Sequence, residues 1–304
     1  MKGIARTSWF CAFFLEIGGM FMSKTGLIME GGAMRGLFTA GVTDVMMENG
    51  IEFDGAIGVS AGAAFGCNYK SKQIGRAARY NIKYCRDSRY CSFKSLITTG
   101  DLFGADFCYR ELPEKLDLFD NATYNTNPME FYVVCTNIET GKPLYKKCDT
   151  TEGELLEWIR ASASMPLVSR IVEVGGYKLL DGGISDSIPL KYFESIGYDK
   201  NVLILTQPKD YIKKKNELLP LIKIILKKYP KLVEAMAIRH EMYNKTTEYI
   251  NEKEKKGDIF VVRPPKKLEI GRIEKDPEKL RQAHQAGRDE GERVIAQMKD
   301  FLKI

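Results

Sequence analysis

One pentapeptide constrains the fold more than any other part of the sequence: Gly58-Val59-Ser60-Ala61-Gly62, which fits the pattern G-x-S-x-G. This pattern is typical of a serine on a sharp turn between a strand and a helix, with glycines that let neighbouring backbone pass without a Cβ clash. The flanking residues fit, because an apolar run over 53–59 predicts a strand and small residues over 61–69 predict a helix. Ser60 is therefore a candidate nucleophile, and Gly58 and Gly62 support its turn.

A glycine loop precedes this motif and lies between a predicted strand (26–29) and a predicted helix (37–49): Glu30-Gly31-Gly32-Ala33-Met34-Arg35-Gly36. Small residues leave backbone N–H groups unshielded, so an anion can approach them. A dinucleotide site would use the loop with Asp54 as its acidic residue, which suggests an oxidoreductase. An oxyanion hole would use the amides of Gly31, Gly32 and Ala33. We favour the oxyanion hole, because the serine motif follows Asp54 almost directly.

Two further residues complete this loop. Arg35 has two interpretations with similar weight: a cation that fixes the loop or faces anionic headgroups, and an ordinary surface arginine at a helix start. Gly36 ends the loop where the helix begins.

A nucleophilic serine needs a base, and the sequence contains only 2 histidines. His240 and His284 both lie in polar helical stretches, so we expect exposed helical side chains. Asp181 is the better candidate, because it ends an apolar run and precedes Gly182 and Gly183. A carboxylate at such a strand end can take the serine proton and return it to the leaving group. An ordinary Asp-Gly turn is the alternative.

The rest of the chain alternates short apolar strands with helical patterns, which favours a mainly parallel sheet covered by helices. Further strands are predicted over 131–136, 143–147, 202–206 and 259–262, with helices over 154–164 and, for the most part, 217–254. From Pro277 onward we predict two helices broken near Gly287.

The composition argues against disulfide bonds and against metal sites. The 7 cysteines are odd in number and lack C-x-x-C spacing, which favours reduced, mostly buried thiols over disulfides or a zinc ribbon. No Asp/Glu cluster suggests calcium, so no metal and no cofactor is expected. The net charge of +6 is mild and permits transient contact with an anionic membrane surface. Nothing in the sequence indicates the oligomeric state.

The N-terminal residues 1–21 admit two interpretations. One is an apolar leader, since Trp9 to Leu15 follows basic residues. The other is a start-site artefact with translation from Met22, because Ile17-Gly18-Gly19 can be encoded by a ribosome-binding sequence. We favour the second. No other segment is long and apolar enough to span a bilayer, so we expect a soluble, cytoplasmic protein, with peripheral membrane contact permitted.

A lysine-rich segment over 213–228 alternates basic residues with leucine and isoleucine. It suits either an interfacial helix on lipid or a helix packed on the sheet with a solvated lysine edge. We favour packing on the sheet, because apolar residues take up much of the helix circumference. Aromatic residues that stack bases are sparse here, so nucleic acid is not an expected partner.

Taken in order, the motifs resemble the patatin-like phospholipase family, of the bacterial type. The glycine loop 31–36, the elbow 58–62 and Asp181-Gly182-Gly183 match its three signature blocks, and Ala161 to Pro166 and Asp186 to Pro189 resemble the segments around its aspartate. The resemblance spans residues 24–206. It implies a three-layer α/β/α catalytic core, which a helical region over 207–304 would complete as one domain.

The resemblance also implies a function. It makes Ser60 the nucleophile, Asp181 the base, and the chain a phospholipase A- or lysophospholipase-like hydrolase of lipid esters that works without a histidine. The family usually has a third glycine where this chain has Ala33, and that methyl group motivates an alternative: a catalytically weak or inactive lipid- or acyl-binding protein of the same fold.

Overall fold

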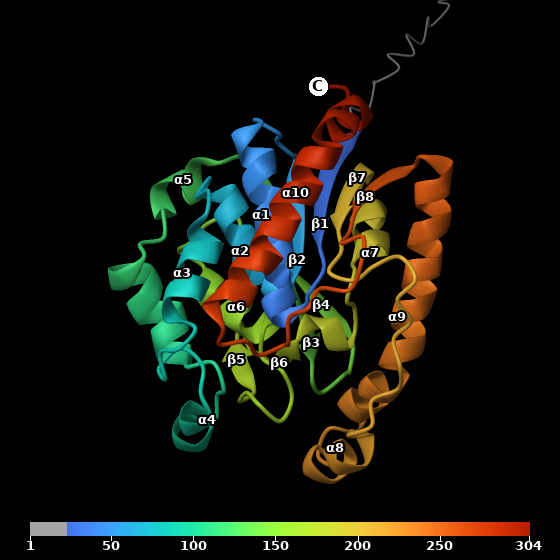
Figure 1. The fold of residues 1–304 in the computed structure, drawn as a ribbon. Coiled ribbons are helices and arrows are strands. Elements are labelled where there is room, and N and C mark those ends of the chain that lie inside the picture. Colours follow the sequence, from blue (N-terminus) through green and yellow to red (C-terminus); the bar gives the residue numbers. More distant parts are fainter. Residues whose placement is uncertain (1–22) are drawn as a thin grey trace, which may run out of the picture.

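The computed structural model describes residues 23–304, and the expectation for residues 1–21 lies outside them (Figure 1). An eight-stranded sheet forms the centre of the molecule, with the path β5-β6-β3-β2-β1-β7-β8 and β4 paired to β3 off this path. Five strands run parallel to one another in the order β3-β2-β1-β7-β8: β1 (Lys24–Met29), β2 (Gly55–Val59), β3 (Glu130–Asn137), β7 (Tyr198–Ile204) and β8 (Ile259–Val262). The mainly parallel sheet predicted from the sequence is confirmed.

Three antiparallel strands extend the sheet beyond β3. They are β4 (Pro143–Lys147), β5 (Val172–Val174) and β6 (Tyr177–Asp181). Strand β6 runs against β3 with Cys135 opposite Asp181. The carboxyl end of β6 therefore lies near the carboxyl ends of the parallel strands β2 and β3.

Helices cover both faces of the sheet. They must, because successive side chains of β1 point to opposite faces and are apolar on both. Leu27 and Met29 pack in one apolar cluster with α1 (Gly36–Glu48), α2 (Ala61–Lys70), α6 (Leu155–Ser162) and α10 (Pro277–Leu302). Ile28 points to the opposite face and packs with α7 (Leu190–Ser195) and α9 (Pro230–Lys256). The predicted α/β/α layering is confirmed, and all six cysteines of the described residues are free.

A group of short helices between β2 and β3 was not predicted from the sequence. It comprises α3 (Arg76–Tyr84), α4 (Phe93–Thr99), the π-helical segment η2 (Phe107–Leu116) and α5 (Asn121–Thr126). The apolar side chains of α3, α4 and η2 form a second cluster with Leu37 of α1 and Phe65 of α2, whereas Tyr124 of α5 packs in the first cluster. These helices build a wall beside the end of β2.

The predicted break at Gly287 is wrong, since α10 runs unbroken from Pro277 to Leu302. A Cβ atom at Gly287 would lie 2.0 Å from the carbonyl oxygen of Phe38, and one at Gly41 would lie 2.1 Å from that of His284. The two glycines let α10 and α1 approach with their backbones nearly in contact. Gly287 is therefore a packing residue inside a helix rather than a helix end.

The lysine-rich segment agrees only in part with the preferred interpretation. Helix α8 (Leu219–Ile225) packs through Leu219 and Ile222 in a cluster with α9 and Leu180 of β6, but its other large apolar side chains are exposed. Within residues 23–304, no helix combines the length and the apolar character needed to cross a membrane.

Candidate active site

Ser60 lies on the turn between β2 and α2 with backbone angles φ 55° and ψ −121°. Positive φ is rare for a residue with a side chain, and it persists here because the surroundings hold it. A Cβ atom on Gly62 would lie 2.3 Å from the carbonyl oxygen of Met29, so only glycine allows β1 this close to the turn. The Ser60 N–H donates to Oγ of Ser162, 2.9 Å away, which fixes the turn from the opposite side.

Asp181 faces Ser60 from the end of β6. The Ser60 hydroxyl donates to Asp181 Oδ2 at 2.6 Å, across 121 residues of sequence, and both side chains are buried. The other carboxylate oxygen, Oδ1, accepts the N–H of Gly183 at 2.8 Å. Burial raises the pKa of Asp181, and the bonds from Ser60 and Gly183 and the charge of Arg239 oppose that rise only in part. The structure thus brings the predicted serine and aspartate together.

The backbone around Asp181 is anchored to β3 and to the segment that follows α6. Its N–H donates to the carbonyl of Ser164 and its carbonyl accepts the Thr136 hydroxyl, both at 2.8 Å. A Cβ atom at Gly182 would lie 2.1 Å from the carbonyl oxygen of Val134, so this glycine permits a close approach to β3. These contacts leave the carboxylate little freedom to move away from Ser60.

The glycine loop passes directly over the serine. A Cβ atom at Gly31 would lie 2.9 Å from the Cβ of Ser60, and one at Gly36 would lie 2.8 Å from the Cβ of Ala61. Ala33 has φ 50°, a left-handed conformation in which glycine is the usual residue. Ala33 therefore keeps a glycine-like backbone and carries the strain of its methyl group.

Arg35 follows in the short 3-10 turn η1 (Ala33–Arg35). Its Nε atom is buried and has no hydrogen-bond partner among residues 23–304. The arginine is therefore not the ordinary surface residue considered from the sequence.

Neither histidine contacts Ser60 or Asp181 within the described part of the chain. His284 pairs with Asp44 at 2.8 Å across the interface of α10 and α1, and His240 lies 3.8 Å from Glu241 on α9. Both side chains are half-buried, so the expected exposure is wrong, while the expected helical placement is correct.

Asp54 is placed for structure rather than for a dinucleotide. Its carboxylate accepts the N–H and hydroxyl of Thr25, at 2.7 and 2.8 Å, at the start of β1. The glycine loop follows the opposite end of β1, whereas a ribose-binding acid lies near the same edge as the phosphate loop. The oxidoreductase interpretation therefore has no support. Residues 23–304 also contain no cluster of three or more His, Cys, Asp or Glu side chains that could hold a metal ion.

Two basic side chains from the C-terminal half lie near Asp181 and the residue that precedes the glycine loop. Arg239 of α9 donates through Nε to the carbonyl of Gly183, next to Asp181. The ammonium of Lys213 lies 4.1 Å from the centre of the Tyr243 ring, and Tyr243 donates to Glu30 beside the glycine loop. Burial, followed by repulsion from Arg239, lowers the pKa of Lys213 to about 8. The sequence offered no local motif for Arg239, and it marked Lys213 only as the first residue of the lysine-rich segment 213–228.

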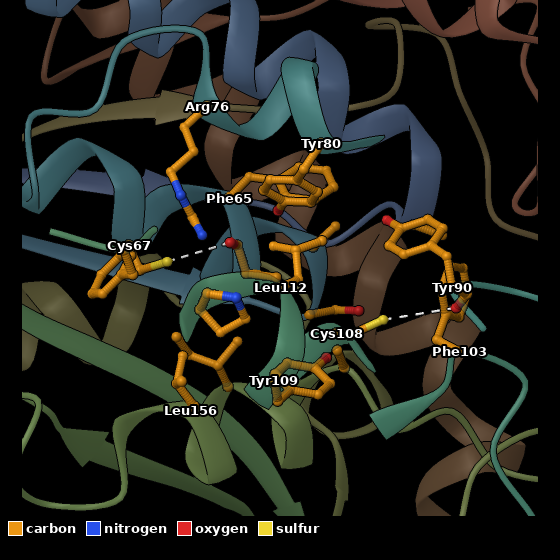
Figure 2. A pocket seen from close by; sticks show the side chains of 18 of the residues that line it. Phe65, Cys67, Arg76, Tyr80, Tyr90, Phe103, Cys108, Tyr109, Leu112 and Leu156 are labelled. Atoms are coloured by element: carbon orange, nitrogen blue, oxygen red, sulfur yellow. Dashed lines mark hydrogen bonds between the residues drawn. The ribbon is translucent and has the colours of Figure 1, made fainter. Parts of the chain in front are cut away.

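An apolar cavity of about 120 Å³ opens beside Ser60. That volume is about ten times what one water needs, so the cavity has room for part of an organic chain. Figure 2 shows its walls: Phe65 and Cys67 from α2, Tyr80 from α3, and Tyr109 and Leu112 from η2, with Leu156 from α6.

The one charged side chain in this lining, Arg76, is held by the carbonyls of Asp117 and Leu118 and by Asn68. The Arg76 guanidinium is therefore already bound by groups of the cavity wall. Sequence reasoning missed the residues from α3 and η2, and the dense aromatic residues of 80–109 were the available signal.

Two family models match parts of this chain. The family model "Patatin-like phospholipase" matches residues 27–194, and the model "Domain of unknown function (DUF6363)" matches residues 229–303. An uncharacterized protein of Escherichia coli, YjjU, is 33% identical over 199 residues, which are 61% of this chain and 52% of that protein. The lysophospholipase NTE1 of Phaeosphaeria nodorum is 27% identical over 187 residues, 58% of this chain and 11% of that protein.

An uncharacterized NTE family protein of Mycobacterium tuberculosis is 24% identical over 190 residues, 62% of this chain and 51% of that protein. The crystal structure of VipD from Legionella pneumophila aligns with a TM-score of 0.46 and 12% identity, over 90% of this chain and 67% of that one. The chain thus spans about half the length of the bacterial relatives and far less of the fungal one. Because the first family model covers more than half of the 304 residues, the chain belongs to the patatin-like phospholipase family.

Proposed function

We propose that the protein is a serine acyl hydrolase that cleaves carboxylic ester bonds of lipids. The observation that carries the proposal is the 2.6 Å contact between the Ser60 hydroxyl and the Asp181 carboxylate beside an apolar cavity. A nucleophile in direct contact with its base, next to a space that accepts an acyl chain, suits ester cleavage.

The reaction follows from this geometry. Ser60 Oγ attacks the ester carbonyl while its proton passes to Asp181. The oxyanion forms under the glycine loop, where the amides of Gly31, Gly32 and Ala33 are the nearest candidate donors. The ester C–O bond then breaks and Asp181 returns the proton to the leaving alcohol. Water attacks the acyl-enzyme with Asp181 again as base, which releases the fatty acid and restores Ser60.

Burial of Asp181 assists both proton transfers. A carboxylate with a raised pKa holds the serine proton more firmly than an exposed one, yet the Gly183 N–H and Arg239 still favour its ionised form. The single carboxylate therefore needs no intervening histidine.

The cations beside the dyad favour a lipid with an anionic headgroup. Arg239 belongs to α9 and Lys213 lies against Tyr243 of the same helix, which covers the sheet face opposite α2 and α6, and Arg239 makes its bond to a carbonyl rather than to a carboxylate. A phosphate attached through glycerol to the ester would meet these charges while the acyl chain occupies the cavity. We therefore propose phospholipids or lysophospholipids, as in phospholipase A and lysophospholipase reactions, as the substrate class.

The alternative of a non-catalytic lipid-binding protein rests on Ala33. Its φ of 50° is the conformation a glycine would take there, so the methyl group does not turn the loop away. The hydrolase therefore remains our proposal.

Two measurements test it. A fluorophosphonate should label the protein once, and mass spectrometry should place the label on the Ser60 peptide. The unlabelled enzyme should release fatty acid from lysophosphatidylcholine faster than from monoacylglycerol. Absence of labelling, or a label elsewhere, would contradict the nucleophile, and equal rates on both lipids would contradict the headgroup assignment.

A further inference from the structure

Two helices expose large apolar side chains at the end of the molecule where the active site lies. In Figure 1, the loops after β1 and β2 are at the lower end, and α4 and α8 flank that same end on either side. Phe93 and Ile97 of α4 are 75% and 85% exposed, and Ile224 of α8 is 69% exposed. We define the docking face as these three residues together with Leu218, Leu221 and Ile225, all exposed.

The docking face is a consequence of how the short helices pack. Helix α8 turns Leu219 and Ile222 toward α9 and leaves Leu221, Ile224 and Ile225 exposed on its other sides. Phe93 and Ile97 are four residues apart and share one face of α4. Isolated exposed apolar residues are ordinary, but six large ones at one end mark an interaction site.

Lysines surround these apolar residues. Lys94 lies beside Phe93, and the segment 214–228 adds five exposed lysines against one acidic residue, Glu217. The ion pairs nearest to this segment in sequence are Lys209–Glu254 and Lys231–Glu234, and neither includes any of these five lysines. The docking face is therefore both apolar and positively charged.

We propose that the docking face binds the surface of an anionic lipid membrane, with its apolar side chains in the interfacial region and its lysines on the headgroups. Apolar residues framed by lysine suit such a surface. A second copy of this chain fits less well, because symmetric pairing would bring the same lysines together without carboxylates to oppose them. The inference deepens the proposed function, since it would set the active-site end against the lipid that holds the substrate.

Vesicle flotation tests the proposal with the full chain carrying Ser60→Ala, so that no lipid is consumed. Vesicles of phosphatidylglycerol and phosphatidylcholine should carry the protein, and pure phosphatidylcholine vesicles should carry at least about tenfold less. The double variant Ile224→Ser/Ile225→Ser should lose about tenfold in partitioning to the mixed vesicles. Ile304→Ser is the matched control, because Ile304 is also exposed, at the opposite end, and should bind like the parent.

A second pair of variants tests the charge. Lys227→Glu/Lys228→Glu should reduce partitioning by more than about tenfold, because each lysine near an anionic surface is worth about fivefold. Lys255→Glu/Lys256→Glu changes two exposed lysines at the far end of α9 and should leave partitioning nearly unchanged.

Three results would overturn the proposal: equal partitioning of the Ile224/Ile225 and Ile304 variants, equal binding to neutral and anionic vesicles, or a dimer in solution that the Ile224/Ile225 change converts to a monomer. The last would assign the face to a second copy. Hydrolysis of a short water-soluble ester separates this inference from the proposed function. A protein that binds vesicles but never cleaves that ester contradicts the hydrolase alone, and an active esterase that ignores vesicles contradicts the docking face alone.

Discussion

Ser60 holds a backbone conformation that costs the folded protein free energy. At φ 55° and ψ −121°, a residue with a side chain is strained by about 1–3 kcal/mol. Ser60→Gly should relieve that strain, and even after the greater freedom of glycine in the unfolded chain the folded state should gain about 1 kcal/mol. Ester hydrolysis should disappear. Ser60→Ala is the control, since it removes the hydroxyl and keeps the strain; equal melting temperatures for the two variants would count against stored strain at the turn.

Asp181, like Ser60, lowers the stability of the folded protein while it serves catalysis: its buried carboxylate must be ionised to accept the serine proton. Asp181→Asn keeps the shape but cannot accept a proton, so kcat should fall about 100- to 10,000-fold. His240→Ala and His284→Ala should change kcat less than about threefold, because neither side chain contacts the dyad. A histidine variant as inactive as Asp181→Asn would mean that a triad operates instead.

The raised pKa of Asp181 also fixes the direction of two pH effects. The base must be ionised, so kcat/KM should fall on acidification with an apparent pKa above that of an ordinary aspartate. Since the folded-state pKa exceeds the unfolded one, ionised Asp181 destabilises the fold at neutral pH, and this cost vanishes as pH falls below both values. Asp181→Asn should therefore melt higher than the parent at pH 7, with a difference that shrinks in acid.

Ala33 offers a milder test of the glycine loop. The left-handed conformation costs an alanine about 1 kcal/mol in the folded state, and glycine would remove that cost. Glycine also gives the unfolded chain more conformational entropy, which lowers the free energy of unfolding by about 0.4–1 kcal/mol. Because the two effects oppose each other, Ala33→Gly should be nearly neutral for stability. We also expect kcat within about threefold of the parent, because the backbone already has the glycine conformation. A tenfold rise in kcat would show that the methyl group misdirects an amide after all.

Residues in short motifs were predictable, and residues that act across the fold were not. Ser60, Asp181 and the glycine loop each lie in a local pattern whose turn demands particular residues. Ser162 reaches Ser60 across 102 residues and Arg239 reaches Gly183 across 56, and no local pattern encodes either contact.

At the scale of elements, the long strands and helices were predictable because their apolar periodicity is strong, whereas α10 shows where propensity fails. Gly287 lowers intrinsic helix stability by about 1 kcal/mol, which motivates a break, but close packing on α1 outweighs that cost. The same limit explains the missed α3 and η2, whose shape depends on packing around the cavity rather than on their own pattern.

Replacement of Gly287 separates these two effects. Propensity alone predicts that Gly287→Ala stabilises the protein by about 1 kcal/mol. A Cβ atom 2.0 Å from the Phe38 carbonyl oxygen must instead push the helices apart, so we expect a net loss of at least about 2 kcal/mol in urea unfolding. A Cβ atom at Gly291, one turn later, would meet nothing closer than the Val45 side chain at 3.2 Å and the Val42 Cα at 3.4 Å, so Gly291→Ala should cost much less. A more stable Gly287→Ala would contradict the close crossing.

At the scale of the whole molecule, the region beyond residue 206 takes part in the same sheet and core as the family-matched region. Strand β8 pairs with β7, and α10 packs Val294, Met298 and Leu302 into the cluster that contains Leu27 and Met29. We therefore propose that residues 207–304 complete one domain with the core rather than form a separate one.

Truncation tests this proposal. Each buried side chain of α10 contributes about 1.5–3 kcal/mol, so loss of four of them (Leu280, Val294, Met298 and Leu302) removes more than about 6 kcal/mol, comparable with the total stability of a typical domain. A chain that ends at residue 206 should be insoluble or should melt without a cooperative transition. Co-expression with a separate 207–304 fragment should restore a soluble complex with esterase activity, because both the β8 pairing and the Arg239 contact return with it. A 1–206 chain that melts cooperatively alone would show that the core is a domain in its own right, and that the C-terminal helices are an attachment to it.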